Sequence, residues 1–127
     1  MREDNNILGC FYGVGVGPGD PELITLKAAG LIERAKVVCY LVNSEGDSQS
    51  RTIAQHHLVP GQVEMPIYMP MSEDATIGSA VYDEAAVAIK LQLEEGKDVV
   101  FLCEGDPLFF GSFAYLLTRI QDEYPCE

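Results

Sequence analysis

The sequence predicts an α/β fold, with an open, mainly parallel sheet flanked by helices. Two observations carry this prediction. Short apolar runs of strand length alternate with longer segments in which apolar residues recur at helical spacing, and glycine or proline punctuates the chain between them. Strands that alternate with helices pair in parallel, and sheets of this kind bind ligands at the carboxyl ends of their strands.

The chain is expected to begin with a strand and a helix. Residues 10–16 (CFYGVGV) are apolar and lead into a glycine-rich loop, which predicts a strand that ends in this loop. A helix is expected within 22–36. Two alternatives are open for its start: Asp20 caps the helix with Pro21 at the first helical position, or Thr25 caps a later start.

The middle of the chain is expected to hold two more strands with a short helix between them. The β-branched run 37–42 (VVCYLV) predicts a strand buried on both faces, and the polar stretch after it predicts a surface loop. A short helix is expected at 51–57 and a brief strand at 63–65. Pro66 and Pro70 are then expected to interrupt regular structure, because proline lacks the amide proton of a sheet ladder.

The last third of the chain is expected to contain a helix, a strand and a second helix. Apolar residues recur at roughly helical spacing within 81–93, and Gly96 stands where that helix would end. The run DVVFLC predicts a strand at 98–103. A helix from about 112 to 121 follows it.

The composition is that of one compact domain that buries a core. The chain has 127 residues, of which 47% are hydrophobic and 22% charged. Its apolar runs are far too short to span a bilayer, so no membrane partner is expected. The polar start MREDNN lacks the apolar region of a signal peptide, and a cytoplasmic location is therefore expected.

Charge and cysteine content exclude two further classes. The formal net charge of −12 argues against nucleic acid as a partner, since nucleic acid binds clustered lysine and arginine. The four cysteines show no CxxC pair, which argues against a disulfide framework and against a zinc site. No metal is therefore expected.

The first glycine-rich loop, GVGVGPGD at 13–20, does not fit a phosphate-binding fingerprint. In the pattern G-x-G-x-x-G the third glycine would fall on Pro18 when counted from Gly13, and on Asp20 when counted from Gly15. Proline removes an amide donor and a carboxylate repels an anion, so the loop suits a neutral or cationic ligand better than a phosphate. The alternative remains open that the glycines only let strand and helix pack closely and that Asp20 caps the helix.

The second glycine-rich loop lies at 105–111, in the stretch FLCEGDPLFFGS. Glu104 and Asp106 are costly beside a phosphate, but they suit a ligand with amino or hydroxyl groups and positive charge. Phe109 or Phe110 offers a flat face that can wall an adenine or another flat ring. The alternative here is an Asp-Pro turn followed by phenylalanines of the core.

Taken together, the two loops closely resemble the tetrapyrrole (corrin and porphyrin) methylase family. GVGVGPGDPELITLKAAGLI is similar to the amino-terminal signature of that family, and EGDPLFFGS is similar to its second motif. CEGDPLFFGSFAYL, with glutamate before the glycine, resembles the branch that methylates precorrin-2 at carbon 20 in cobalamin synthesis. The resemblance covers the chain from about Leu8. It implies that residues 1–127 are the amino-terminal αβ domain of such an enzyme, with the second domain absent from this chain.

The resemblance implies methyl transfer from S-adenosylmethionine to a tetrapyrrole, precorrin-2 or its cobalt-loaded counterpart, without a dedicated nucleophilic side chain. Competing hypotheses are methylation at another ring position, a catalytically silent binding module and a Rossmann oxidoreductase. The resemblance also implies a homodimer. The cofactor-binding residues that the family motifs imply are Pro18, Glu104, Gly105, Asp106 and Phe109.

Two further residues are candidates for contacts with the substrate. Asp20 would line the substrate side of the cleft, unless it caps the helix. Arg51 would meet a substrate carboxylate, unless it lies on a solvated helix face. Because precorrin-2 carries many carboxylates, a chain with a net charge of −12 is a poor electrostatic host, and basic groups would have to come from a second domain or from a local patch.

Overall fold

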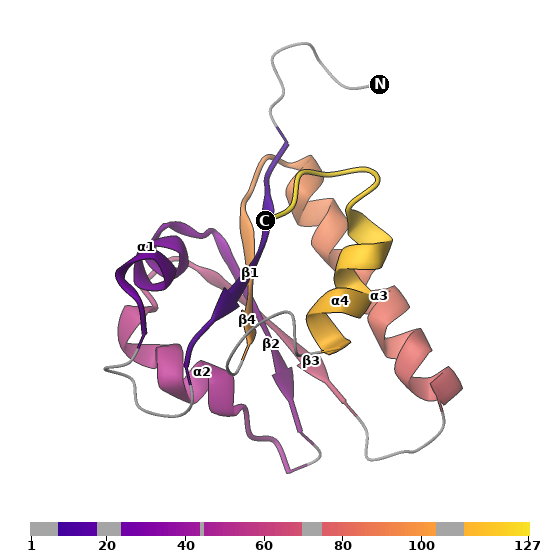
Figure 1. Ribbon diagram of the computed structural model, residues 1–127, viewed down its shortest axis with the longest axis horizontal. Helices are drawn as coiled ribbons and strands as arrows, with labels where there is room; N and C mark the ends of the chain where they lie inside the picture. Colours follow the sequence, from indigo (N-terminus) through magenta and orange to yellow (C-terminus); the bar gives the residue numbers. More distant parts are fainter. Residues whose placement is uncertain (1–7, 18–23, 44, 70–74, 104–110) are drawn as a thin grey trace.

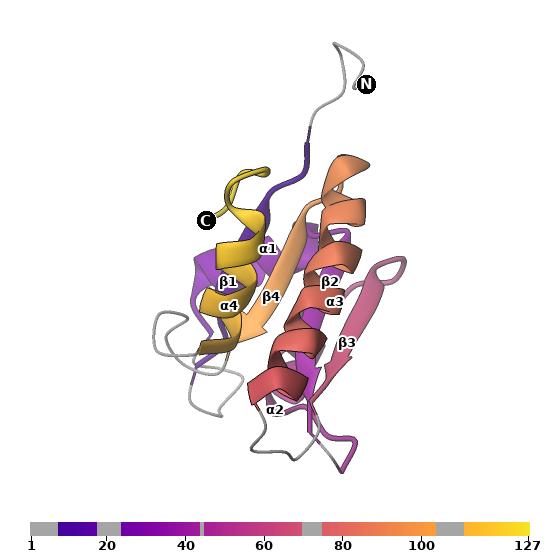
Figure 2. The ribbon, with the colours of Figure 1, turned by 90° about the vertical axis from the view of Figure 1, so that its right-hand side faces the viewer.

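The computed structural model describes residues 8–17, 24–43, 45–69, 75–103 and 111–127. Its elements, in chain order, are β1 (Phe11–Gly15), α1 (Leu26–Arg34), β2 (Val37–Val42), α2 (Gln49–Ala54), the short 3₁₀ helix η2 (Gln55–His57), β3 (Val63–Tyr68), α3 (Ala75–Glu94), β4 (Val99–Cys103) and α4 (Gly111–Ile120). Helices α1 and α2 cover one face of the sheet, and α3 and α4 cover the other (Figures 1 and 2). This three-layer arrangement confirms the predicted α/β fold.

The four described strands pair in parallel, in the order β1-β4-β2-β3. The predicted open parallel sheet is therefore confirmed. Along the inner strand β4, Phe101 faces the core under α3 and α4, while Val100 and Leu102 face the core under α1 and α2. Every residue of β4 is buried. Burial on both faces explains why the inner strands are continuous apolar runs in the sequence.

Side-chain caps set the starts of α1 and α2. The hydroxyl of Thr25 accepts the N–H of Ala28 at 3.1 Å, so the second of the two alternatives for the start of α1 is confirmed. Ser48 caps α2 by accepting the N–H of Arg51. The helix therefore begins at Gln49 rather than at residue 51, and the polar surface loop before it is shorter than expected.

Helix α3 begins at Ala75, well before the expected residue 81. Gly78 and Ser79 have weak helix propensity, so the sequence alone does not predict this part of the helix. A tertiary contact is present there instead: the guanidinium of Arg119 in α4 donates to Ser79 Oγ at 3.2 Å. Packing of α3 against α4 thus overrides the weak local preference.

Strand β3 corrects one expectation, because it continues through Pro66 to Tyr68. The N–H of Val63 donates to the carbonyl of Lys36, just before β2, at 2.9 Å, and the N–H of Met69 donates to the carbonyl of Val42, the last residue of β2, at 3.0 Å. The alternation of the strand therefore turns the nitrogen of Pro66 toward the outer edge of the sheet, where a missing N–H breaks no ladder bond. The predicted interruption at Pro66 was wrong because the edge position of a strand is set by tertiary pairing. Pro70 lies outside the described residues.

The last residues of the chain lie along the outer edge of β1. The N–H of Phe11 donates to the carbonyl of Pro125, and that of Gly13 to the carbonyl of Glu127, both at 2.9 Å. The N–H of Glu127 donates to the carbonyl of Phe11 at 2.8 Å. This segment runs parallel to β1. It covers the outer backbone groups of β1 as far as Gly13.

Candidate functional site at the ends of β1 and β4

The two glycine-rich loops leave the sheet side by side. In the register of β1 and β4, Gly15 is the partner of Cys103, and each is the last residue of its strand. The N–H of Val16 then donates to the carbonyl of Cys103 at 2.8 Å, which extends the pairing by one step. Parallel strands place their carboxyl ends at one edge of a sheet, which is where such sheets bind ligands. The expected location of the two loops is therefore confirmed for the residues from which they start.

Most of the predicted site residues lie outside the described residues and stay predictions. They are Pro18, Glu104, Gly105, Asp106 and Phe109 for the cofactor, and Asp20 for the substrate. The structure shows the frame to which their segments are attached. Gly17 and Ile24 flank the first segment, and Cys103 and Gly111 flank the second.

The structure explains why two positions of the first motif are occupied by glycine. Gly17 has a φ of 89°, a left-handed conformation that residues with a Cβ rarely adopt, just after the chain leaves β1. Gly13 lies within β1, and a Cβ placed there would meet the ring of Phe113 at 2.6 Å. Close packing therefore explains Gly13. Its partner is α4, the helix after the second loop, rather than the helix after the first.

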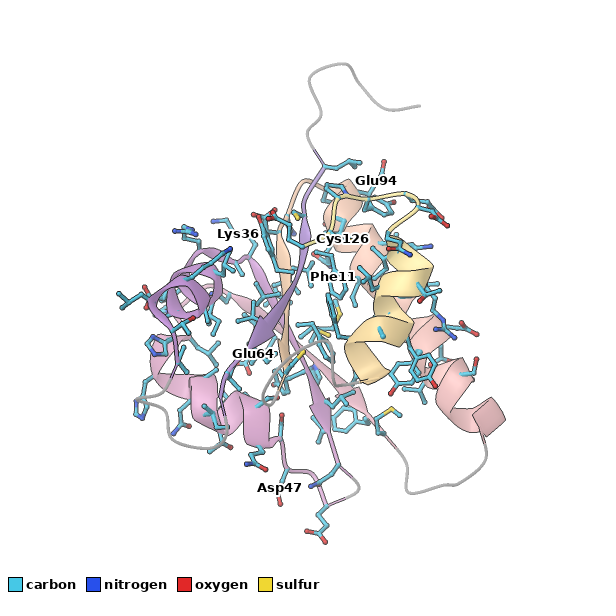
Figure 3. All side chains as sticks on the ribbon, in the orientation of Figure 1. Phe11, Lys36, Asp47, Glu64, Glu94 and Cys126 are labelled. Atoms are coloured by element: carbon cyan, nitrogen blue, oxygen red, sulfur yellow. The ribbon has the colours of Figure 1, made fainter. Side chains whose placement is uncertain are left out.

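Phe113 lies in the first turn of α4, within an aromatic cluster formed with Phe11 and Phe101. Its ring centroid is 5.4 Å from that of Phe11 and 6.4 Å from that of Phe101. Figure 3 shows Phe11 on β1 beside α4. The aromatic cluster attaches the start of α4 to β1 and β4. One end of the second segment is thus held by core packing, and the other end by sheet hydrogen bonds.

Arg51, the described substrate candidate, is engaged by a carboxylate. Its Nε lies 2.7 Å and its Nη2 3.3 Å from the two carboxylate oxygens of Glu64 in β3, and the hydroxyl of Tyr40 donates to the same carboxylate at 2.8 Å. The hydrogen bonds from Arg51 and then Tyr40 lower the pKa of Glu64, while burial and the hydrogen bond to Glu64 raise the pKa of Tyr40. Arg51 thus joins α2 to β3. Its contact with a substrate stays a prediction.

Glu64→Gln is expected to lower the free energy of unfolding at pH 7 by about 0.5–1 kcal/mol, a small effect because solvent screens a pair whose side chains are 38% exposed. Folding lowers the pKa of Glu64, so this stabilisation is present above the ordinary carboxyl pKa and is lost as the pH falls through the lowered value. Urea titrations at pH 7 and in acid measure the difference. Glu45→Gln, in an exposed turn, controls for the loss of one negative charge. Equal stabilities of wild type and Glu64→Gln at pH 7 would contradict the prediction.

Exposed acids lie just after β2, the strand next to β4. The turn that contains Glu45 and Asp47 is closed by Asn43, whose Oδ1 accepts the N–H groups of both residues at 2.9 and 3.0 Å. Lys27 is exposed in the first turn of α1 and has no ion-pair partner among the described residues. The sequence-based prediction of site residues missed Lys27, although its place in ITLKAAG, seven positions after the end of the first loop, was a signal.

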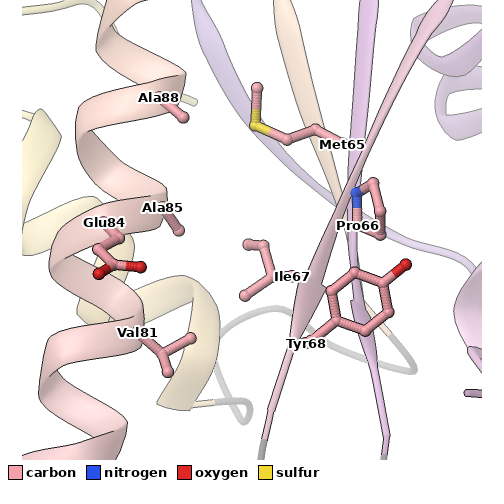
Figure 4. A pocket seen from close by; sticks show the side chains of 8 residues that line it. All are labelled: Met65, Pro66, Ile67, Tyr68, Val81, Glu84, Ala85 and Ala88. Carbon is pink, nitrogen blue, oxygen red and sulfur yellow. The ribbon is translucent and has the colours of Figure 1, made fainter.

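A groove of about 300 Å³ lies between β3 and α3 (Figure 4). Its wall is mostly apolar, with the carboxylate of Glu84 on the α3 side, while the hydroxyl of Tyr68 points away from α3. Because β2 lies between β3 and β4, the groove is separated from the strand ends that carry the two loops. The lining residues are Met65, Pro66, Ile67, Tyr68, Val81, Glu84, Ala85 and Ala88.

Neither a metal site nor a membrane-spanning helix occurs in the part of the chain that the structure describes. No three histidine, cysteine, aspartate or glutamate side chains of these residues are grouped to hold a metal ion. No helix there combines the length and the apolar character that crossing a membrane requires. Cys39, in β2, is buried in the core under α3 and α4, and this burial raises the pKa of its thiol, which therefore packs as a small neutral side chain.

Fold and strand ends together define a parallel α/β domain in which two glycine-rich segments start from neighbouring strands at one edge of the sheet. The sequence profile of the Tetrapyrrole (Corrin/Porphyrin) Methylases matches residues 10–127. The chain belongs to this family. The resemblance inferred from the two motifs is therefore confirmed.

Three relatives show how this chain compares with known proteins. It is 35% identical to the precorrin-2 C(20)-methyltransferase of Sinorhizobium sp in an alignment 128 residues long, gaps included. The alignment covers 94% of this chain and 52% of the relative. It is 42% identical to the cobalamin biosynthesis protein CobIJ of Mycobacterium tuberculosis over 120 residues, 88% of this chain and 24% of the relative. A crystal structure of uroporphyrin-III C-methyl transferase from Thermus thermophilus complexed with S-adenyl homocysteine matches with a TM-score of 0.61 at 28% identity, over 94% of this chain and 43% of that one. The chain thus spans between about a quarter and about half of the length of these proteins.

Proposed function

We propose that this chain is part of an S-adenosylmethionine-dependent methyltransferase that methylates carbon 20 of precorrin-2, or of its cobalt-loaded counterpart, in cobalamin biosynthesis. The observation that carries the proposal is the match to a precorrin-2 C(20)-methyltransferase over 94% of this chain. The stretch CEGDPLFFGSFAYL, which resembles the same branch, supports this ring position. A homodimer, which the family resemblance implies, belongs to the same proposal.

The proposed cofactor site is the edge where β1 and β4 end. S-adenosylmethionine carries a sulfonium and an ammonium group, and the exposed acids Glu45 and Asp47 near this edge fit a ligand with positive charge. The solved Thermus enzyme, which shares the fold, is a complex with S-adenyl homocysteine. In the second segment, Asp106 is proposed to accept hydrogen bonds from the amino or hydroxyl groups of the cofactor. The other proposed contacts are Pro18, Glu104, Gly105 and Phe109.

The proposed role of the chain in the reaction is alignment. When bound, S-adenosylmethionine supplies an electrophilic methyl group to an electron-rich ring carbon of the substrate. The residues around the strand ends are proposed to orient the two reactants and to exclude water, rather than to attack either of them. The hydrogen-bonded ends of β1 and β4 suit this role, because Gly15 and Cys103 are held in fixed register.

Recognition of the substrate carboxylates needs positive charge, which is scarce in a chain with a net charge of −12. Of the described bases, Lys27 is the best placed, since it is exposed in the first turn of α1, the helix that follows the first loop. We therefore propose Lys27 as a contact for one substrate carboxylate. Arg51 is the weaker candidate, because Glu64 already accepts hydrogen bonds from its guanidinium. Asp20 is proposed to line the substrate side.

A calorimetric titration of the chain with S-adenosylhomocysteine tests the cofactor site. We expect saturable binding and, for Asp106→Ala, a loss of affinity of about tenfold or more, because a hydrogen bond to a charged group is worth roughly 1.5–3 kcal/mol. Asp122→Ala, which removes an exposed acid from the turn after α4, is the matched control. No binding by the wild type, or equal weakening by the two variants, would contradict the proposed site.

Methylation at another ring position is the second candidate, favoured by the likeness to the uroporphyrin-III enzyme at 28% identity. The product separates the two. The enzyme expressed from its complete gene would be given precorrin-2 and S-adenosylmethionine with a ¹³C-labelled methyl group, and the label located by NMR. A label on carbon 20 supports the first candidate. A label elsewhere, or methylation of uroporphyrinogen III without methylation of precorrin-2, supports the second.

A further inference from the structure

The contact between Gly13 and Phe113 joins the two motifs. Gly13 belongs to the first motif and lies in β1, whereas Phe113 follows the second motif in the first turn of α4. A Cβ on Gly13 would stand 2.6 Å from Cζ and 2.7 Å from Cε1 of the Phe113 ring. Phe113 is only 5% exposed and packs against Phe11 and Phe101. The ring therefore has no open space into which it can turn away from an added methyl group.

The segment that carries the second motif, 104–110, runs between two described ends, and both ends are attached to β1. Cys103 is attached by its pairing with Gly15 and by the hydrogen bond from the N–H of Val16. The start of α4 is attached through Phe113, whose ring lies on Gly13. A substitution at Gly13 therefore acts on one end of the segment, while the sheet pairing at the other end involves different residues.

We propose that Gly13 and Phe113 are positioning residues, which fix the start of α4 on β1 and thereby set the spacing between the two motifs. The inference rests on the proposed function, since it concerns how the two halves of the proposed cofactor site are held together. Its physical basis is close packing. Because the ring of Phe113 packs directly against the backbone of Gly13, α4 can lie on β1 in only one position. An added atom at such a close contact forces the helix or the backbone to shift.

Gly13→Ala tests this inference through the affinity for S-adenosylhomocysteine. The added methyl group is expected to displace the start of α4 and to weaken binding about tenfold or more, since small misplacements are costly at a site assembled from several elements. Gly78→Ala is the matched control, because it adds the same methyl group in α3, where nothing lies within 4 Å, and its affinity should equal that of the wild type. Each titration is made at a temperature at which urea unfolding shows the variant to be fully folded.

The double variant Gly13→Ala/Phe113→Leu separates positioning from a general loss of stability. It removes the ring atoms that the new methyl group meets, so the start of α4 is expected to return and most of the affinity to recover. Unchanged affinity in Gly13→Ala, even with lowered stability, would overturn the inference. A loss that the double variant does not recover would overturn it as well.

Amide NMR spectra without ligand provide a readout that does not depend on binding. The signals of Phe113 and Ala114 are expected to shift in Gly13→Ala and to return in the double variant. Shifts confined to β1 would overturn the inference. If the wild-type chain binds no S-adenosylhomocysteine, the proposed cofactor site fails, and these spectra still decide whether Gly13 sets the position of α4.

Discussion

Phe101→Ala is expected to lower the free energy of unfolding by about 3–5 kcal/mol. Phe101 is 1% exposed in β4, an inner strand, and its ring lies 6.4 Å from that of Phe113. Removal of the ring leaves a cavity between hydrogen-bonded strands and the packed helix α4, which cannot close without loss of other contacts. Urea unfolding followed by circular dichroism measures the effect, which is a large part of the roughly 5–15 kcal/mol that holds a domain together.

Val87→Ala is the control for Phe101→Ala. Val87 is 60% exposed on α3, so its truncation is expected to change the stability by about 0.5 kcal/mol or less. Phe101→Leu leaves a smaller cavity and keeps the comparison possible if the alanine variant does not fold. Similar stabilities of all three variants would show that the aromatic cluster is not a rigid part of the core.

Gln62→Glu is expected to lower the free energy of unfolding at pH 7 by about 2–3 kcal/mol, the cost of unsatisfied and repelled polar groups. The Nε2 of Gln62 donates to the carbonyls of Ile32 and Ala35 at 2.6 and 2.9 Å, and its Oε1 accepts the N–H of Val59 at 2.9 Å. The substitution keeps the shape of the side chain. It replaces the two donors by an oxygen that faces two carbonyl oxygens, so the last turn of α1 loses its hydrogen-bond partner. Urea unfolding measures the loss.

The pH dependence of the Gln62→Glu effect identifies its cause. Two facing carbonyl oxygens raise the pKa of the introduced carboxyl in the folded state. Below the ordinary pKa of glutamate, about 4.3, the protonated group still donates one hydrogen bond, and the loss of stability relative to wild type is small. The loss then grows as the pH rises toward the raised folded pKa. Gln121→Glu, in the exposed turn after α4, should show no such trend. An equal loss at pH 4 and pH 7 would contradict this account.

The elements that could be predicted from the sequence are those whose signal is local. The run 37–42 matches β2 residue for residue, because a strand buried on both faces is apolar throughout. The strand through Pro66 and the early start of α3 could not be predicted in the same way. The first depends on which edge of the sheet β3 occupies, and the second depends on Arg119, which lies far along the chain.

The same distinction applies to the candidate site. The two motifs and their place at strand ends follow from local patterns of glycine, acid and apolar residues. The reason for Gly13 does not, because its partner Phe113 lies 100 positions later and is brought to it only by the packing of α4 on β1. Likewise, neither alternative considered for Arg51, a substrate contact or a solvated helix face, predicts the hydrogen bond from its guanidinium to Glu64, which joins α2 to β3.

The course of the chain beside β1 has a practical consequence for protein production. Pro125–Glu127 runs parallel to β1 and pairs with it as far as Gly13. A polypeptide fused behind Glu127 would therefore continue along the outer edge of β1 toward Gly15. An affinity tag at that position would lie beside the ends of β1 and β4 and could obstruct the proposed cofactor site there. The start of β1 lies at the opposite end of the strand. Protein for titrations should therefore carry its tag ahead of β1, or have it cleaved off.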